Sequence, residues 1–199
     1  MSCLKQKTPD YLILINEDNR LPENFVDTVE LISVRNSEGT EYVIEKKTYE
    51  AFMRLREDIL KNDGLQAELI SVYRTVAQQE KTFNGYVDKF GIEYARKYAA
   101  IPGHSEHHTG FAIDVSFVVE GRLPRLIKEL LEMDDLFKIV HKKLAKYGFI
   151  LRYPSGKEDI TKIGYEPWHF RYIDSLENAG EIAEADICFE EYWEKKLNG

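Results

Sequence analysis

An alternating run of apolar residues, GFAIDVSFVV at positions 110–119, places the strongest limit on how this chain folds. Successive side chains of a strand point to opposite faces, so the odd-numbered residues of this run form one apolar face. The other face carries Asp114 between the small residues Ala112 and Ser116. Carboxylates are rarely buried without a partner. The run therefore predicts a buried strand whose single acidic residue has a specific partner.

The rest of the chain mixes strand-like and helix-like patterns without strict βαβ alternation. Strands are predicted at 11–16, on both sides of a turn at 36–39, and at 67–74, 110–119, 149–154 and 168–173. Helices are predicted at 47–61, 76–90, 92–100, 123–148 and 179–197. This order predicts an α+β fold with a small antiparallel sheet flanked by helices. We expect a single domain over residues 1–199, with its core at about 12–173 and a C-terminal helix at 179–197.

Charge and cysteine content narrow the range of partners and compartments. The net charge is −8, which argues against a nucleic-acid partner. No apolar run is long enough to span a membrane. Cys3 and Cys188 form no paired motif, and two free thiols in a reducing compartment are expected. We therefore expect a cytoplasmic protein. The alternative is an extracytoplasmic protein from which a leader or anchor has been removed.

Two polar segments predict a metal site. The first, GHSEHHTG, holds three histidines just before the strand that carries Asp114, and the second, GYEPWHFRY, holds Glu166 and His169. If the two strands are neighbours, Asp114 and His169 can converge, and one upstream histidine would complete three ligands. Such a set with an open position is typical of catalytic zinc. Glu166 would then suit the role of general base.

A purely structural interpretation is the alternative to the metal site. A histidine-rich loop is commonly solvated, and Arg171 could pair with an acidic residue. This interpretation leaves Asp114 without a partner.

The same residues match the motifs of a known family. Ser105, His107, Gly110, Ala112 and Asp114 fit the pattern S-x-H-x-x-G-x-A-x-D, and EPWH at 166–169 fits E-x-W-H. The segment SVYRTVAQQ at 71–79 is similar to an S-x-Y-R-[ST] segment with a downstream glutamine. Together these motifs resemble the zinc D-Ala-D-Ala carboxypeptidases of the VanY type, which include VanXY-type D,D-dipeptidase/carboxypeptidases and LdcB-like L,D-carboxypeptidases. The similarity covers about residues 12–173.

The resemblance implies a metal centre with one zinc ion per chain. His107, Asp114 and His169 resemble the zinc ligands, and Glu166 resembles the catalytic base. The match selects His107 among the clustered histidines.

The resemblance also implies how a substrate is held. Arg74 resembles the arginine that holds the scissile carbonyl oxygen. Ser71, Gln79 and Ser105 match positions that help to hold the terminal D-residue and its carboxylate.

The remaining histidines lie at positions that the family does not use for zinc. For His104 and His108 we expect roles in loop structure or pocket lining, and for His141 a place at the surface.

The implied function is zinc-dependent hydrolysis of the terminal D-Ala-D-Ala bond of peptidoglycan precursor peptides. Typical VanY-like enzymes carry an N-terminal anchor, which this chain does not show, and its length is close to that of cytoplasmic VanXY-type enzymes. One alternative is an L,D-carboxypeptidase that acts on tetrapeptides. Another is a zinc-bearing module that binds peptidoglycan peptides without cleaving them.

Overall fold

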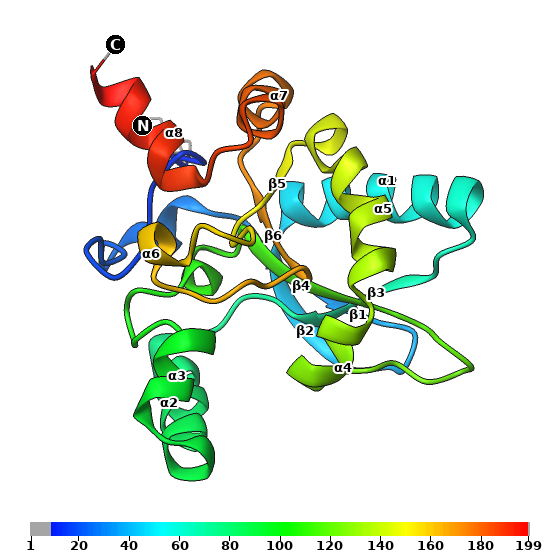
Figure 1. The fold of residues 1–199 in the computed structure, drawn as a ribbon, viewed down its shortest axis with the longest axis horizontal. Coiled ribbons are helices and arrows are strands. Elements are labelled where there is room, and N and C mark those ends of the chain that lie inside the picture. The colour runs from blue at the N-terminus through cyan, green and yellow to red at the C-terminus, as the bar shows by residue number, and fades with distance from the viewer. Residues whose placement is uncertain (1–8, 199) are drawn as a thin grey trace, which may run out of the picture.

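Two small antiparallel sheets organise the computed structural model, which describes residues 9–198 (Figure 1). The first sheet pairs β1 (Leu31–Arg35) with β2 (Glu41–Glu45). The second has the strand order β3-β4-β6-β5. Its strands are β3 (Ala67–Ser71), β4 (Ala112–Phe117), β5 (Phe149–Leu151) and β6 (His169–Tyr172). All of its pairings are antiparallel, so the predicted α+β class is confirmed.

Helices flank both sheets. The longer ones are α1 (Lys46–Asp63), α2 (Val76–Phe90), α5 (Asp134–Leu144), α7 (Leu176–Ala185) and α8 (Phe189–Asn198). The shorter ones are α3 (Ile92–Tyr98), α4 (Ile127–Glu132) and α6 (Glu158–Thr161). Three 3-10 turns are η1 (Phe25–Thr28), η2 (Glu106–Thr109) and η3 (Ala145–Tyr147).

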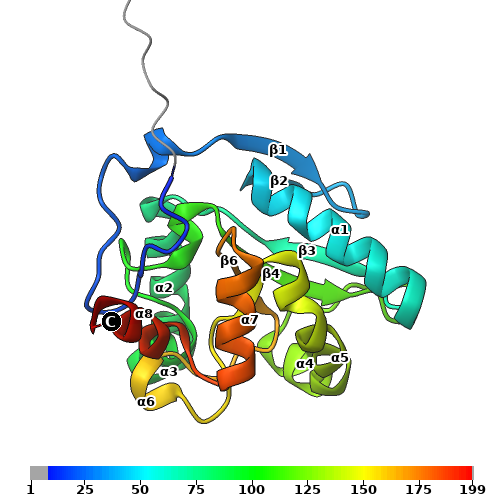
Figure 2. The same cartoon turned by 90° about the horizontal axis from the view of Figure 1, so that it is seen from above.

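The main core lies between the apolar face of the four-stranded sheet and the helices α1 and α5. Ile113 and Phe170 are fully buried there, together with Phe52 of α1 and Phe137 of α5. The two helices contact each other, and α1 also lies beside the β1–β2 ribbon (Figure 2). The odd-numbered residues of β4 therefore form the core face, as predicted, and Asp114 points to the opposite side.

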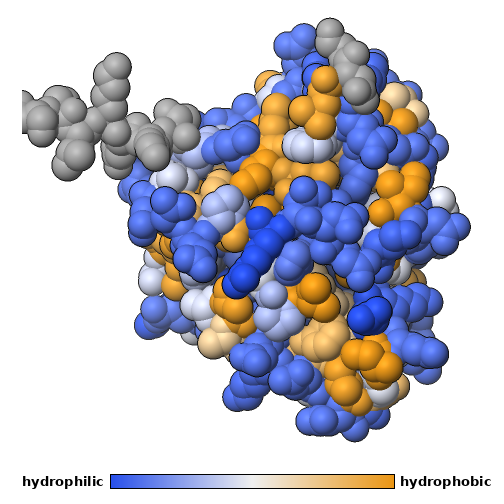
Figure 3. Space-filling view, turned by 90° about the vertical axis from the view of Figure 1, so that its left-hand side faces the viewer, coloured by the Kyte–Doolittle hydropathy of each residue, from blue (hydrophilic) through white to orange (hydrophobic). Residues whose placement is uncertain are grey.

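The helices α2 and α3 form a hairpin that lies apart from α1 and α5 (Figure 1). Thr75 begins α2 with a capping box, in which its hydroxyl accepts from the Gln78 backbone. The hairpin has a small apolar cluster of its own around Phe83. Its tip is apolar as well, because Phe90 and Ile92 are about half exposed, and hydrophobic residues gather at the lower end of the face in Figure 3.

The predicted strand at 11–16 is wrong. This segment has no strand partner, and arginine side chains satisfy its carbonyl groups instead. Arg171 donates to the carbonyls of Tyr11 and Ile13, and Arg152 donates to that of Ile15. Because the segment is buried against these guanidinium groups, its backbone needs no neighbouring strand.

Two long predicted helices are each divided in the structure. The range 123–148 contains α4, α5 and a 3-10 turn, and Met133 has non-helical dihedral angles between the two helices. The range 179–197 falls into α7 and α8, with Asp186 in the left-handed conformation at the end of α7. Apolar periodicity continues across both breaks, and for this reason the sequence pattern did not reveal them.

Two further features concern membrane spans and cysteines. Among residues 9–198, no helix is long and apolar enough to cross a membrane. Cys188 is a buried free thiol, whereas Cys3 lies outside the described residues.

Gly110, between η2 and β4, has a positive φ of 80° and lies in a confined space. An added Cβ would lie 3.1 Å from Leu31 Cδ2 and 3.3 Å from the Glu45 nitrogen. Gly39 has nearly the same φ, 79°, but open space around it. We predict that Gly39→Ala lowers the free energy of unfolding by about 1 kcal/mol, the cost of the left-handed backbone alone. Gly110→Ala should cost about 2–4 kcal/mol because crowding is added. Urea unfolding measures both, and equal losses would contradict the crowding argument.

Candidate metal centre

His107 is oriented by its own short turn and by a backbone carbonyl. Ser105 caps η2, and its hydroxyl accepts from the His107 backbone N–H at 3.3 Å. The ring Nδ1 lies 2.7 Å from the carbonyl oxygen of Val72. A carbonyl only accepts, so Nδ1 carries the proton and Nε2 keeps a free lone pair. That lone pair is what a metal ligand requires.

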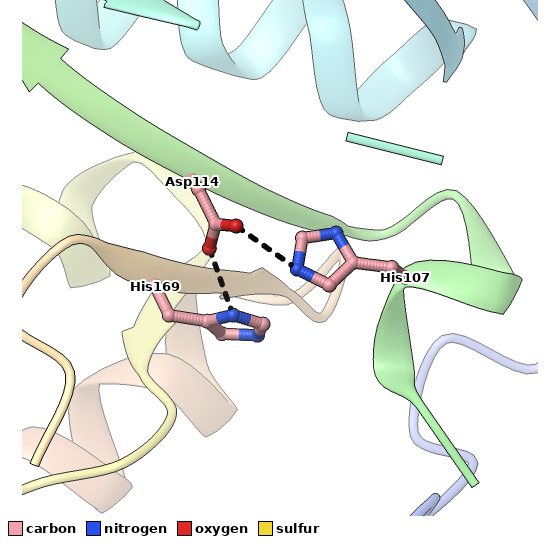
Figure 4. A group of neighbouring side chains, drawn as sticks. All are labelled: His107, Asp114 and His169. Atoms are coloured by element: carbon pink, nitrogen blue, oxygen red, sulfur yellow. Dashed lines mark ion pairs between the residues drawn. The ribbon is translucent and has the colours of Figure 1, made fainter. Parts of the chain in front are cut away.

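Asp114 and His169 face each other because β4 and β6 pair in antiparallel register with these two residues opposite. The Asp114 Oδ1 atom lies 3.0 Å from His169 Nδ1, and Oδ2 lies 3.2 Å from His107 Nε2 (Figure 4). The structure therefore brings Asp114 and His169 together with the upstream His107.

The three side chains fit a metal ion. One ligand atom from each of His107, Asp114 and His169 lies within 4.8 Å of the others. His107 Nε2 and Asp114 Oδ1 are buried and have no hydrogen-bond partner among the residues that the structure describes. Buried polar atoms without partners are rare, and a shared cation would satisfy both. Two imidazoles and a carboxylate are a common donor set for zinc.

The protonation of the two histidines differs. Burial, together with the charge of Arg74, lowers the pKa of His107 to about 4, so this ring is neutral. Burial alone would lower the pKa of His169, but the carboxylates of Asp114 and Glu106 outweigh it and raise the pKa to about 9. A metal ion must therefore displace a proton from His169 but none from His107.

Glu166 lies beside the three candidate ligands without belonging to the closest group. Its Oε2 is 3.6 Å from His169 Nδ1, and the residue is buried. Burial raises the pKa of Glu166 to about 8, although the charges of His169 and Arg74 partly oppose the shift. A cation held by the three ligands would favour the ionised carboxylate and lower this pKa.

Arg74 lines the same cavity. Its backbone N–H donates to the carbonyl of His107, so its position is tied to the candidate ligand. The side-chain Nε is buried, and residues 9–198 offer it no hydrogen-bond partner. The guanidinium group therefore has donors available for a substrate oxygen.

The cavity over the three ligands has a volume of about 270 Å³. Ser71 and Ser105 line it, as do Arg74 and Glu166. Gln79 does not line it, because its amide nitrogen donates to the carbonyl of Ala100 in the cavity wall. Seven of the eight predicted site residues therefore line one cavity, and Gln79 lies behind its wall. The seven are Ser71, Arg74, Ser105, His107, Asp114, Glu166 and His169.

The other histidines have structural contacts. His108 donates from Nδ1 to the Arg74 carbonyl, and its Nε2 accepts from the Gly103 backbone. His104 donates to the carbonyl of Asn16, so both residues hold the loop, as expected. His141 was expected at the surface; it is half-buried, and its Nε2 donates to the Pro167 carbonyl at 2.8 Å. That contact supports the loop that carries Glu166 and leads to His169 in β6.

A buried charged group lies behind the site. Glu106 accepts from Arg152 at 2.7 Å and from Arg171 at 2.8 Å, and Arg152 also pairs with Glu190 of α8. Burial alone would raise the pKa of Glu106, but the two arginines hold it well below its usual value. The suggestion that Arg171 pairs with an acid was the only sequence signal of this group, and it is confirmed.

Residues 41–175 match the family described as VanY: D-alanyl-D-alanine carboxypeptidase. The chain belongs to this family. The match includes both motifs and all three candidate ligands.

Individual relatives agree with this assignment. The chain is 35% identical over 140 residues to the bifunctional D-Ala-D-Ala dipeptidase and D-Ala-D-Ala carboxypeptidase VanXYC of Enterococcus gallinarum, which covers 68% of the chain and 72% of that relative. The structure of the LdcB LD-carboxypeptidase matches with a TM-score of 0.78 at 35% identity, over 93% of this chain and 86% of that one. The vancomycin-resistance D,D-pentapeptidase VanY in complex with Zn(II) matches with a TM-score of 0.74 at 27% identity, over 92% of this chain and 98% of that one.

The raised pKa of His169 predicts how metal affinity depends on pH. Below about pH 9 the metal-free ring is protonated, and each ion bound must release that proton. We expect the apparent zinc affinity to rise at least tenfold per pH unit between about pH 6 and 8, because Glu166 can release a second proton as the bound cation lowers its pKa. Competition with a chromophoric chelator at three pH values measures this slope. A zinc affinity that stays constant over this range would show that His169 is not a ligand that loses a proton when the metal binds.

Proposed function

We propose that this chain is a zinc-dependent carboxypeptidase that removes the last residue of peptides ending in D-Ala-D-Ala, working as one peptidase domain. In this proposal His107, Asp114 and His169 hold one zinc ion. The observation that carries the proposal is the group of three converging ligands with Glu166 and Arg74 in one cavity, in a chain of the VanY family. The zinc-bound VanY relative supports the choice of metal.

Glu166 is the proton carrier in this proposal. When bound, zinc supplies a Lewis acid that activates a water molecule and polarises the scissile carbonyl. The Glu166 carboxylate, held close to His169, accepts the proton of the attacking water. It then gives this proton to the nitrogen of the departing amino acid. No covalent intermediate with the protein is needed.

Arg74 and the two serines hold the substrate. The unpaired Arg74 donors suit the scissile carbonyl oxygen, on which negative charge develops during attack. The hydroxyl groups of Ser71 and Ser105 lie in the same cavity and suit the terminal residue and its carboxylate. Gln79 acts on the substrate only through the cavity wall, where it fixes the Ala100 carbonyl.

The cavity favours peptides over the free dipeptide D-Ala-D-Ala. Asp114 and Glu166 are the only acidic residues among the described residues that line it, and both have other roles here. The charged amino group of a free dipeptide would therefore enter without a carboxylate partner, which is unfavourable in a buried site. Tyr98 and Ile127 also line a neighbouring groove of about 380 Å³, which gives room for a longer chain.

An L,D-carboxypeptidase acting on tetrapeptides is the second candidate. The TM-score of 0.78 and the 35% identity to the LdcB structure favour it. The two activities differ in the residue that precedes the scissile bond, so a substrate panel separates them.

The substrate panel consists of UDP-MurNAc-pentapeptide, the matching tetrapeptide and free D-Ala-D-Ala, each assayed for D-Ala release with zinc and with a chelator. We expect chelator-sensitive release, fastest from the pentapeptide and slowest from the dipeptide. Release from the tetrapeptide alone would select the L,D-activity. Bound zinc without any release would identify a binding module and contradict the proposal.

Glu166→Gln tests the proton carrier. The amide cannot accept the proton of the attacking water, so we expect kcat to fall about 10²–10⁴-fold. Zinc content should remain one ion per chain because Glu166 is not among the three ligands. Glu158→Gln, in α6 and outside the cavity, is the matched control and should keep wild-type activity. Wild-type turnover by the Glu166 variant would show that this residue is not the base.

A further inference from the structure

Glu106 lies at the centre of the buried charged group behind the metal centre. It is 1% exposed, and both Arg152 and Arg171 are fully buried. Both arginines donate to the same carboxylate oxygen, Oε1, at 2.7 and 2.8 Å. The other oxygen, Oε2, makes no hydrogen bond with any residue of the range 9–198. A buried carboxylate oxygen without a donor needs an explanation.

The atom that faces Glu106 Oε2 is His169 Nε2, at 3.9 Å. This ring nitrogen is also buried and has no hydrogen-bond partner in the described part of the chain. The opposite ring nitrogen, Nδ1, faces Asp114 Oδ1 at 3.0 Å. His169 therefore turns one nitrogen toward the metal centre and the other toward Glu106. A small approach of the two unpartnered atoms would give each the hydrogen bond that it lacks.

We propose that Glu106 is a positioning residue that holds the proton of His169 on Nε2 and so directs the Nδ1 lone pair at the metal. The inference rests on the proposed metal centre. In this arrangement Arg152 and Arg171 fix the carboxylate by its Oε1 atom, and this leaves Oε2 for the histidine. A hydrogen bond from a ligand histidine to a carboxylate orients the ring and strengthens its binding to metal.

Glu106→Gln should move the ring proton of His169 from Nε2 to Nδ1. The two arginines only donate, so they would hold the oxygen of the new amide. Its NH2 group would then face His169 Nε2 as a donor and favour the ring with its proton on Nδ1. In that tautomer the nitrogen facing Asp114 has no lone pair for a metal. The substitution changes neither the size nor the shape of the side chain.

Glu190→Gln is the matched control. Glu190 is buried and accepts from the same arginine, Arg152, at 2.6 and 2.9 Å. No contact joins Glu190 to His169 among the described residues. If the charged group only stabilises the fold, the two variants should behave alike. If Glu106 positions His169, only Glu106→Gln should change the metal centre.

The test measures zinc affinity by chelator competition for the full-length wild type and both variants, with unfolding followed by circular dichroism. We expect Glu106→Gln to bind zinc about 10–100-fold more weakly than the wild type. Glu190→Gln should bind zinc as the wild type does, even where its stability is reduced. Equal affinities of the two folded variants would overturn the inference.

A second measurement uses the wild type and therefore does not depend on whether a variant folds. Long-range proton–nitrogen NMR of the zinc-loaded wild type, with labelled histidine, reports which ring nitrogen carries the proton. We expect the proton of His169 on Nε2 and that of His107 on Nδ1. A His169 proton on Nδ1 would overturn this inference and leave the proposed function intact. A wild type that binds no zinc would overturn the proposed function together with this inference.

Discussion

The antiparallel pairing of β4 with β6 is the constraint on which the metal centre depends. It places Asp114 opposite His169, and the neighbouring pair Ile113 and Phe170 is fully buried on the other face. A shift of the register by one residue would exchange the two faces of a strand and expose its core residues. The burial of ordinary apolar side chains therefore determines where two ligands of the candidate metal site meet.

The buried charges behind the site join parts of the chain that are far apart in sequence. Arg171 and Arg152 hold the carbonyls of the segment at 11–15, and Glu190 brings α8 onto the same group. Burying ions is costly, and removal of one partner leaves another charge unpaired. Such a group adds little to the net free energy of unfolding, but it holds its members in a single arrangement. In the proposed metal centre, the member that this arrangement positions is His169.

Local patterns predicted the faces of strands, because strand parity depends only on neighbouring residues. They placed Asp114 and His169 on polar faces, and family motifs then selected His107. The reason for that selection lies in a contact with Val72, 35 residues away, which no local pattern shows. Glu106 and Arg152 were missed in the same way, since their pairing spans 46 residues. The error at 11–16 arose because side chains replaced the strand that would normally satisfy its backbone.

The hairpin of α2 and α3 has its own apolar cluster, separate from the core that supports the sheet. Tyr86 and Tyr98 of this hairpin line the cavity from one side, while the ligands reach it from the sheet and η2. Mutations in the hairpin can therefore accumulate without disturbing the residues that perform the chemistry. Evolution could change which peptides are accepted within this family while the catalytic apparatus stays intact.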